Sequence, residues 1–158
     1  MVDMNNLEVH FSSRSSEWGT PWPLFHKLEE LFGRFTLDPC ATRENAKCEK
    51  FFTREDDGLR KSWHGHRVFM NPPYGREITK WIRKAYDEAR DESTMVVCLI
   101  PTRTDTRWWH ECVMKADEIW FIRGRVKFQG ARYPAPFPSA VVVFRNPPAS
   151  PTIHSLLI

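Results

Sequence analysis

The chain has 158 residues, of which 41% are hydrophobic and 13% aromatic, which is enough for one compact domain with a core and too little for two. Lys and Arg number 23 against 20 Asp and Glu, so the formal net charge is only +3. This balance excludes a strongly cationic body, and any contact with nucleic acid is expected from a local basic surface.

The cysteines and the apolar segments predict a cytoplasmic protein without a membrane span or a metal site. Cys40, Cys48, Cys98 and Cys112 form no CxxC pair and have no His at zinc-finger spacing, which indicates reduced thiols. The longest apolar run, 95–100, is far shorter than the ~18–20 residues that cross a bilayer.

The chain begins with a polar, Ser-rich stretch, residues 1–17, which we expect to form a mobile arm. The first helix is predicted over 22–32, where apolar residues recur at helical spacing until Gly33. Thr20 is a candidate cap for this helix, and the prolines near its start suit a first turn.

Beyond this helix, short apolar strands alternate with amphipathic helices. Strands are predicted at 35–37, near 49–53, and at 68–70, 95–100, 118–122 and 140–144, and helices over 76–90 and near 105–115. This alternation predicts an α/β sheet with helices on both faces. Residues 18–146 are expected to form a single domain, and the Pro-rich residues 147–158 a tail that leaves the fold.

The sequence Asn71-Pro72-Pro73-Tyr74 follows the predicted strand 68–70 directly. Ligands of open α/β sheets bind at the carboxyl ends of strands. Two prolines remove two N–H donors and fix two φ angles, so the nearby carbonyls become rigid acceptors. An aromatic amine needs such acceptors before it attacks a methyl group, because its lone pair is delocalised into the ring. We therefore predict that the Asn71 side chain and the Pro72 carbonyl accept the amine protons, while Tyr74 stacks on an extruded base.

The shorter signals each have an ordinary structural interpretation. Taken alone, Thr20-Pro21 is typical of a helix start, Asp57-Gly58 of a turn and Asp38-Pro39 of a strand exit. A second Asn-Pro-Pro sequence at 146–148 lacks the aromatic residue, and we interpret it as structural. Only the order of the motifs along the chain favours function.

A longer set of motifs carries a family resemblance: Glu17-Trp18-Gly19-Thr20-Pro21, Phe35-Thr36-Leu37-Asp38-Pro39-Cys40-Ala41, Asp57-Gly58-Leu59 with Trp63, Asn71-Pro72-Pro73-Tyr74, and Gly124-Arg125-Val126-Lys127-Phe128. Over most of residues 16–145 the chain resembles the compact Dam-like DNA N6-adenine methyltransferases of phages and prophages. The resemblance implies a Rossmann-like methyltransferase sheet, S-adenosylmethionine as cofactor, and transfer of its methyl group to N6 of a flipped adenine in double-stranded DNA. The location would then be the cytoplasm of a bacterial host.

Two departures from common methyltransferase patterns shape these expectations. Only 33 positions separate Asp38 from Asn71, too few for two strand–helix units of ~30 or more residues each, so a sheet trimmed relative to the full seven-stranded form is expected. The loop after the predicted strand 35–37 contains no glycine. Side chains, rather than close approach of the backbone, are therefore expected to hold the cofactor.

The resemblance also implies a set of cofactor-binding residues: Thr20, Pro21, Asp38, Pro39, Cys40, Asn45, Asp57 and Asn71. Thr20 and Pro21 would contact the methionine part, and Asp38 would lie beneath its charged end. Asp57 would accept from the adenine amine of the cofactor, and Asn45 is a further candidate for the same pocket.

No segment of this sequence is recognisable as a target-recognition domain, so DNA contacts are expected from basic residues in loops: Arg103, Arg107, Arg125, Lys127 and Arg132. Phe128 and Tyr133 are interleaved with them, a mixture that suits phosphate and base contacts. The alternative is a solvated surface loop. Trp108 and Trp109 are interpreted as core residues.

Other functions fit parts of this pattern. A methyltransferase acting on a protein glutamine amide or on an RNA adenine would use the same Asn-Pro-Pro-Tyr sequence. A catalytically silent nucleic-acid-binding module would account for the missing glycine loop, although the intact Asn71 and Tyr74 argue against it. The sequence determines neither the target DNA sequence nor the oligomeric state.

Overall fold

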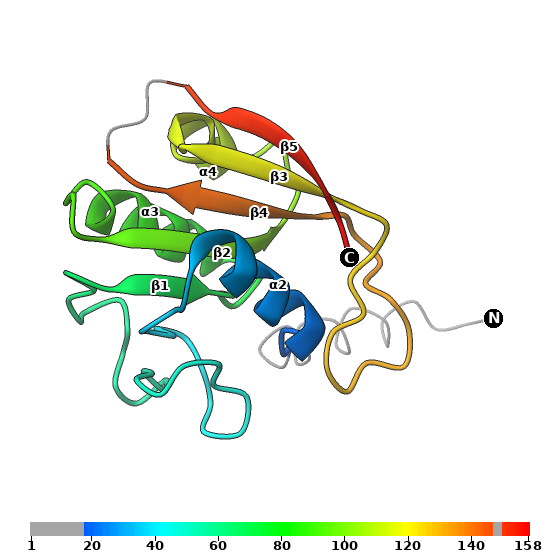
Figure 1. Cartoon of the computed structure of the whole chain (residues 1–158), viewed down its shortest axis with the longest axis horizontal. Helices are drawn as coiled ribbons and strands as arrows, with labels where there is room; N and C mark the ends of the chain where they lie inside the picture. Colours follow the sequence, from blue (N-terminus) through cyan, green and yellow to red (C-terminus); the bar gives the residue numbers. More distant parts are fainter. Residues whose placement is uncertain (1–17, 147–149) are drawn as a thin grey trace.

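The computed structural model describes residues 18–146 and 150–158, so the predicted arm 1–17 lies outside the described residues. Within these ranges the chain is a mixed α/β structure built around a five-stranded sheet (Figure 1). The helices are α2 (Trp22–Phe32), α3 (Ile78–Glu88), α4 (Arg107–Glu111) and the 3-10 helix η1 (Val113–Lys115). The strands are β1 (Arg67–Met70), β2 (Met95–Pro101), β3 (Glu118–Arg123), β4 (Ser139–Phe144) and β5 (Thr152–Leu157).

The strands are arranged in the order β1-β2-β4-β3-β5. β1 is parallel to β2 and β3 is parallel to β5, whereas β4 is antiparallel to both of its neighbours. All strands except β4 therefore run in the same direction, and their carboxyl ends lie at one edge of the sheet. The loops that begin at Asn71, Thr102 and Gly124 share this carboxyl edge.

The stretch before β1 runs beside it without forming a regular strand. Leu37 pairs with Val68 and Asp38 with Phe51 in isolated parallel bridges, so the strands predicted at 35–37 and 49–53 are reduced to single bridges. Pro39 has no N–H and cannot extend the pairing. The bridge beside β1 brings Asp38 to the carboxyl edge, where Asn71 also lies.

The core lies on both faces of the sheet. Along β2, Val97 and Leu99 pack on the side of α2, while Val96, Cys98 and Ile100 pack on the side of α3 and α4. In Figure 1, α2 lies in front of the sheet and the other two helices lie behind it. The predicted placement of helices on both faces is thus confirmed.

The helices follow their predicted positions, with corrections at their ends. α2 covers the predicted range 22–32, but its N-cap is Pro21, whose side chain cannot accept a hydrogen bond; the predicted cap Thr20 lies one residue earlier and accepts from Asn71. The helix predicted near 105–115 is shorter: α4 ends at Glu111 and continues as η1. Trp108 and Trp109 are buried core residues, as predicted. None of the described helices is long and apolar enough to cross a bilayer.

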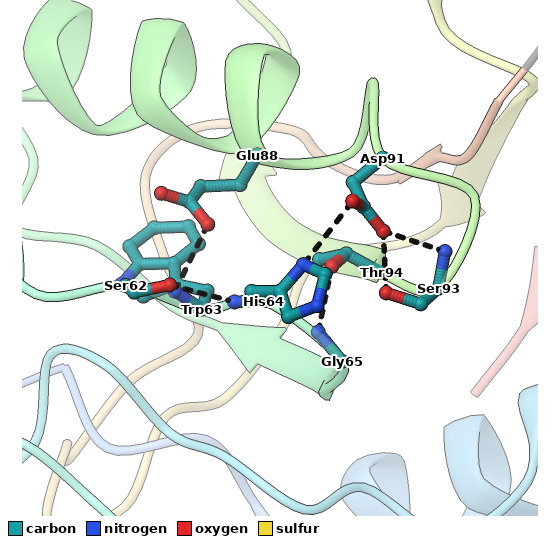
Figure 2. Close-up of polar contacts among 8 residues, drawn as sticks. All are labelled: Ser62, Trp63, His64, Gly65, Glu88, Asp91, Ser93 and Thr94. Atoms are coloured by element: carbon teal, nitrogen blue, oxygen red, sulfur yellow. Dashed lines mark hydrogen bonds and ion pairs between the residues drawn. The ribbon is translucent and has the colours of Figure 1, made fainter.

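Polar contacts join the two chain reversals that precede β1 and β2 (Figure 2). The Gly65 amide donates to the Thr94 hydroxyl at 3.0 Å, and the His64 ring lies 3.1 Å from the Asp91 carboxylate. The Trp63 amide donates to Glu88, at the end of α3, at 2.9 Å. These contacts hold β1 and β2 in register at the edge opposite Asn71.

The expectation that residues 147–158 leave the fold is wrong for the last part of this segment. Residues 152–157 form β5, which pairs in parallel with the whole of β3. Leu156 is 4% exposed and belongs to the core on the α2 side. The prolines that suggested an exit precede the strand, and a strand tolerates proline ahead of its first residue.

We predict that Leu156→Ala lowers the free energy of unfolding by about 2–4 kcal/mol, because a buried leucine leaves a cavity in the core. Leu157→Ala is the matched control: Leu157 neighbours it on β5 but is 64% exposed, and a change within about 0.5 kcal/mol is expected. Urea unfolding of both variants gives the comparison. Equal effects would mean that β5 does not contribute to the core.

Candidate active site

A pocket lies at the carboxyl edge beside the end of β1. It is lined by residues from the segment before α2, the loop after Asp38, and β1 with the loop after it: Trp18, Gly19, Thr20, Asp38, Cys40, Asn45, Lys47, Phe69, Asn71, Pro72 and Pro73. Most of the residues predicted for catalysis and cofactor binding therefore meet in one place. Trp18, Gly19, Lys47 and Phe69 are additional lining residues.

The Asn71 side chain is held in one orientation. Its Nδ2 donates to the Trp18 carbonyl oxygen at 2.6 Å and to Thr20 Oγ1 at 3.0 Å. A backbone carbonyl only accepts hydrogen bonds, so the amide nitrogen must face Trp18 and the Asn71 Oδ1 must face the other way. The site thereby presents an amide oxygen of known direction.

The Tyr74 hydroxyl is the partner of that oxygen. It donates to Asn71 Oδ1 at 3.0 Å and lies 3.3 Å from the Leu99 carbonyl oxygen. Burial raises the pKa of Tyr74, which keeps the hydroxyl protonated and able to donate. An amide oxygen has two lone pairs, so one remains for a further donor. Sequence reasoning assigned a role to the Tyr74 ring alone and missed this contact.

The Asp38 carboxylate is 4% exposed and lies at the base of the pocket. Desolvation by burial raises its pKa from 3.8 to about 6, against hydrogen bonds from the backbone amides of Lys47 and Cys40 that lower it. The Lys47 bond measures 3.1 Å. A negative charge held in so dry a place is costly, and such positions are common at functional sites.

Several lining residues stabilise the loop that carries them. Asn45 Oδ1 accepts from the Thr42 amide at 2.7 Å and closes a turn. Cys40 donates through its Sγ to the Asn71 carbonyl oxygen at 3.3 Å, and burial raises the pKa of its thiol, so the group stays neutral. Trp18 belongs to a family motif, but sequence reasoning assigned it no role in the site. Lys47 was not predicted, and its only sequence clue is its position two residues after Asn45.

Pro21, Pro39 and Asp57, among the predicted cofactor residues, do not line the pocket. Asp57 adopts a φ of 54° in a turn and faces Arg60 at 3.5 Å. Its turn packs closely on the loop after Asp38. The contact is so tight that a Cβ added to Gly58 would lie 2.0 Å from the Pro39 carbonyl oxygen. The acid thus borders the pocket loop without reaching the lining.

The loop between β3 and β4, residues 124–138, packs against the pocket wall. The Gln129 amide donates to the Gly19 carbonyl at 2.8 Å, and the ring of Phe128 meets Trp18 edge to face. Arg125 and Lys127 are exposed, alternating with buried residues. The basic side chains of this loop are therefore displayed beside the site.

The other basic candidates differ in their surroundings. Arg103 is exposed in the loop after β2, at the same carboxyl edge. Arg107 pairs with Glu111 within α4 at 2.9 Å. Arg132 lies over the ring of the exposed Tyr133, 5.4 Å from its centroid.

We predict that Asp38→Asn makes the protein more stable at pH 7.5 by about 1–3 kcal/mol. Because the folded pKa of about 6 exceeds the unfolded value of 3.8, ionisation of Asp38 destabilises the fold increasingly as the pH rises through this window. Urea unfolding of both proteins between pH 4 and pH 8 measures the difference. The hydrogen bond that Asp38→Asn loses changes the free energy of unfolding equally at every pH. A stability difference that does not vary with pH would therefore contradict the raised pKa of Asp38.

Residues 10–147 match the family described as DNA N-6-adenine-methyltransferase (Dam). The chain is 35% identical over 113 residues to the DNA N-6-adenine-methyltransferase of Haemophilus phage HP1 (strain HP1c1). The matched region covers 70% of this chain and 65% of the relative. The chain is 33% identical over 106 residues to the DNA N-6-adenine-methyltransferase of Escherichia phage T1, covering 66% of this chain and 44% of the relative. The chain thus spans less than two thirds of these curated relatives. Because the family match covers most of the sequence, the predicted resemblance is confirmed, and the chain belongs to the DNA N-6-adenine-methyltransferase (Dam) family.

Proposed function

We propose that this chain transfers the methyl group of S-adenosylmethionine to the N6 amine of an adenine extruded from double-stranded DNA. Membership of the Dam family and the names of the two phage relatives support the reaction and the substrate. The fixed orientation of the Asn71 amide is the observation that carries the proposal, because it leaves a free lone pair on Oδ1 of a residue that lines the pocket.

Asn71 acts as an acceptor and not as a general base, because a neutral amide does not take up a proton at neutral pH. Its free lone pair accepts one N6–H of the adenine, which shifts electron density onto the nitrogen. Within the described chain the Pro72 carbonyl receives no hydrogen bond, so it is available for the second N6–H. Rigid acceptors of this kind contribute by positioning and by preorganised polarity.

Tyr74 contributes through both its hydroxyl and its ring. The hydroxyl donates to the Asn71 oxygen, whose direction the bond to the Trp18 carbonyl fixes. The ring is half-buried and meets Phe128 and Phe137 edge to face, with centroids 6.3 and 5.6 Å away. We propose that this ring stacks on the extruded base, which offsets part of the cost of unstacking.

The donor set of the pocket fits S-adenosylmethionine. When bound, the cofactor supplies an electrophilic methyl group on a sulfonium centre. The buried Asp38 carboxylate suits the positive charge of its methionine end, and Thr20 and Asn45 offer neutral polar contacts. Pro39 and Cys40 shape the same loop, and Pro21 follows Thr20. Asp57 remains our proposed partner of the cofactor's adenine amine, since its turn borders this loop.

We interpret the architecture as a trimmed, Rossmann-like methyltransferase sheet. The pocket lies at the carboxyl ends of β1 and its neighbours, where open α/β sheets bind ligands. The stretch 39–66 contains turns and a single bridge in place of further strands and helices. We propose that the catalytic domain comprises residues 18–146 together with β5.

DNA contacts are proposed for the loops at the carboxyl edge. Arg125 and Lys127 extend from the loop that packs on Gly19, and Arg132 and Tyr133 follow in the same loop. Arg103 lies in the loop after β2, which is joined to loop 124–138 by the bond from the Thr102 amide to the Pro138 carbonyl. Arg107 is the weakest member, because Glu111 already neutralises it.

We predict that Asn71→Ala lowers the single-turnover methylation rate about a hundredfold or more, on the order of the ~3 kcal/mol of one preorganised catalytic hydrogen bond. Cofactor affinity should change little. Asn71→Asp should be milder than Asn71→Ala because the carboxylate keeps an acceptor, although it loses the donor that faces the Trp18 carbonyl. Asn146→Ala is the matched control, since Asn146 opens the second Asn-Pro-Pro sequence and is exposed.

The substrate class is tested by offering labelled S-adenosylmethionine with duplex DNA, RNA and protein in parallel. Label in the N6 position of duplex DNA is expected. A wild-type rate for Asn71→Ala would refute the acceptor mechanism, and label entering only protein or only RNA would refute the substrate assignment.

We predict that the double variant Arg125→Gln, Lys127→Gln weakens DNA binding and makes the slope of log affinity against log salt concentration shallower by about 1–2. The reason is that a protein with two fewer phosphate contacts releases fewer counterions on binding. The charge-matched control is Lys61→Gln with Arg90→Gln, two exposed residues near the opposite edge of the sheet. Fluorescence anisotropy at several salt concentrations measures both. An unaltered slope would assign loop 124–138 to packing.

A further inference from the structure

Lys47 is a buried lysine whose ammonium directly contacts neutral groups and is attracted by the Asp38 carboxylate from beyond ion-pair distance. Only 9% of the residue is exposed, and it lines the pocket beside Asp38. Its Nζ donates to Gln129 Oε1 at 3.0 Å and sits 4.1 Å from the ring centroid of Trp22. These contacts place the ammonium against α2 and loop 124–138, while the residue itself lines the pocket.

The ammonium has no counter-ion in the described part of the chain. The nine ion pairs found there include neither Lys47 nor Asp38, although the Lys47 amide bonds the Asp38 carboxylate. Desolvation lowers the pKa of Lys47, against an electrostatic attraction from Asp38 that raises it. A buried cation supported by an amide oxygen, an aromatic ring and a carboxylate beyond ion-pair distance is costly, and a bound anion would compensate it.

We propose that Lys47 binds the α-carboxylate of the methionine moiety of S-adenosylmethionine, opposite Asp38, which takes the α-ammonium. This inference rests on the proposed function. The pocket lining contains one carboxylate and one ammonium, and they are not paired with each other. An α-amino acid carries the same two charges on one carbon. A pocket that keeps its opposite charges apart is complementary to such a zwitterion, whereas a nucleoside without the amino acid would leave both uncompensated.

The position of Lys47 in the fold supports a specific contact. Its backbone is fixed by the bond to Asp38, so the lysine and the acid cannot separate without breaking the loop. Its Nζ is held by Gln129, which belongs to a loop tied to Gly19 by a backbone hydrogen bond. The side chain is therefore preorganised before any ligand arrives, and little rotamer entropy remains to be lost on binding.

The test compares two probes that differ only in the carboxylate: S-adenosylhomocysteine and its decarboxylated analogue, S-adenosyl-3-thiopropylamine. Isothermal titration calorimetry on the full chain is expected to give about tenfold or greater preference for S-adenosylhomocysteine, the order associated with one charge-assisted hydrogen bond. Lys47→Met should lower the affinity for S-adenosylhomocysteine by a similar factor and leave that for the analogue nearly unchanged, so the preference falls to within about threefold.

Lys50→Met is the matched control, because Lys50 lies in the same segment, is exposed, and contacts His66 instead of the pocket. It should retain the full preference. Lys47→Arg should restore part of it, and far-UV circular dichroism with thermal unfolding verifies that each variant is folded.

The outcomes separate this inference from the proposed function. Equal affinity of the wild type for both probes would overturn the role of Lys47, whatever the variants do, while leaving the cofactor assignment intact. A folded Lys47→Met variant that keeps the full preference would also overturn it. Failure of the wild type to bind either probe would instead overturn the cofactor assignment, and this inference with it.

Discussion

The hydrogen bond from Asn71 Nδ2 to the Trp18 carbonyl is the contact on which the geometry of the site depends. It joins the end of β1 to the segment before α2, which are 53 positions apart in the chain. It also determines that the amide nitrogen faces Trp18 and the amide oxygen faces Tyr74. The same segment carries Gly19, whose carbonyl bonds Gln129 and brings loop 124–138 to the pocket wall. The acceptor, the entry to α2 and the basic loop are therefore positioned by one small set of backbone contacts.

The charged groups of the pocket indicate that stability has been given up for binding. Asp38 is buried with backbone amides as its hydrogen-bond partners, and burial raises its pKa to about 6 even against the attraction of Lys47. Lys47 lies close by without a counter-ion in the described chain. Folding would favour pairing these two groups or replacing them by apolar residues. A ligand that carries both charges gives a physical reason for keeping them apart.

Some of the elements that position this site could be predicted from local sequence, and others depend on partners that are distant in the chain. The predicted ranges of α2, β1 and β2 agree with the structure within a few residues, because local apolar periodicity reports which face is buried. The strands predicted at 35–37 and 49–53 survive only as single bridges, since pairing length depends on a neighbour and on the intervening proline. β5 was missed because its partner, β3, lies about thirty positions away and its own pattern is only one-sided.

By itself, the sequence determined the α/β class, the place of Asn71-Pro72-Pro73-Tyr74 after a buried strand, and the family, because these depend on local pattern and on the order of motifs. Only the tertiary structure decided that Thr20 bonds Asn71 instead of capping α2, that the Trp18 carbonyl orients the Asn71 amide, and that Lys47 shares a pocket with Asp38. The contacts of Asn71 join it to a segment more than fifty positions away, which meets it at the carboxyl edge of the sheet. Spacing along the chain carries no record of which side chains meet there, because the loops between the strands set that geometry.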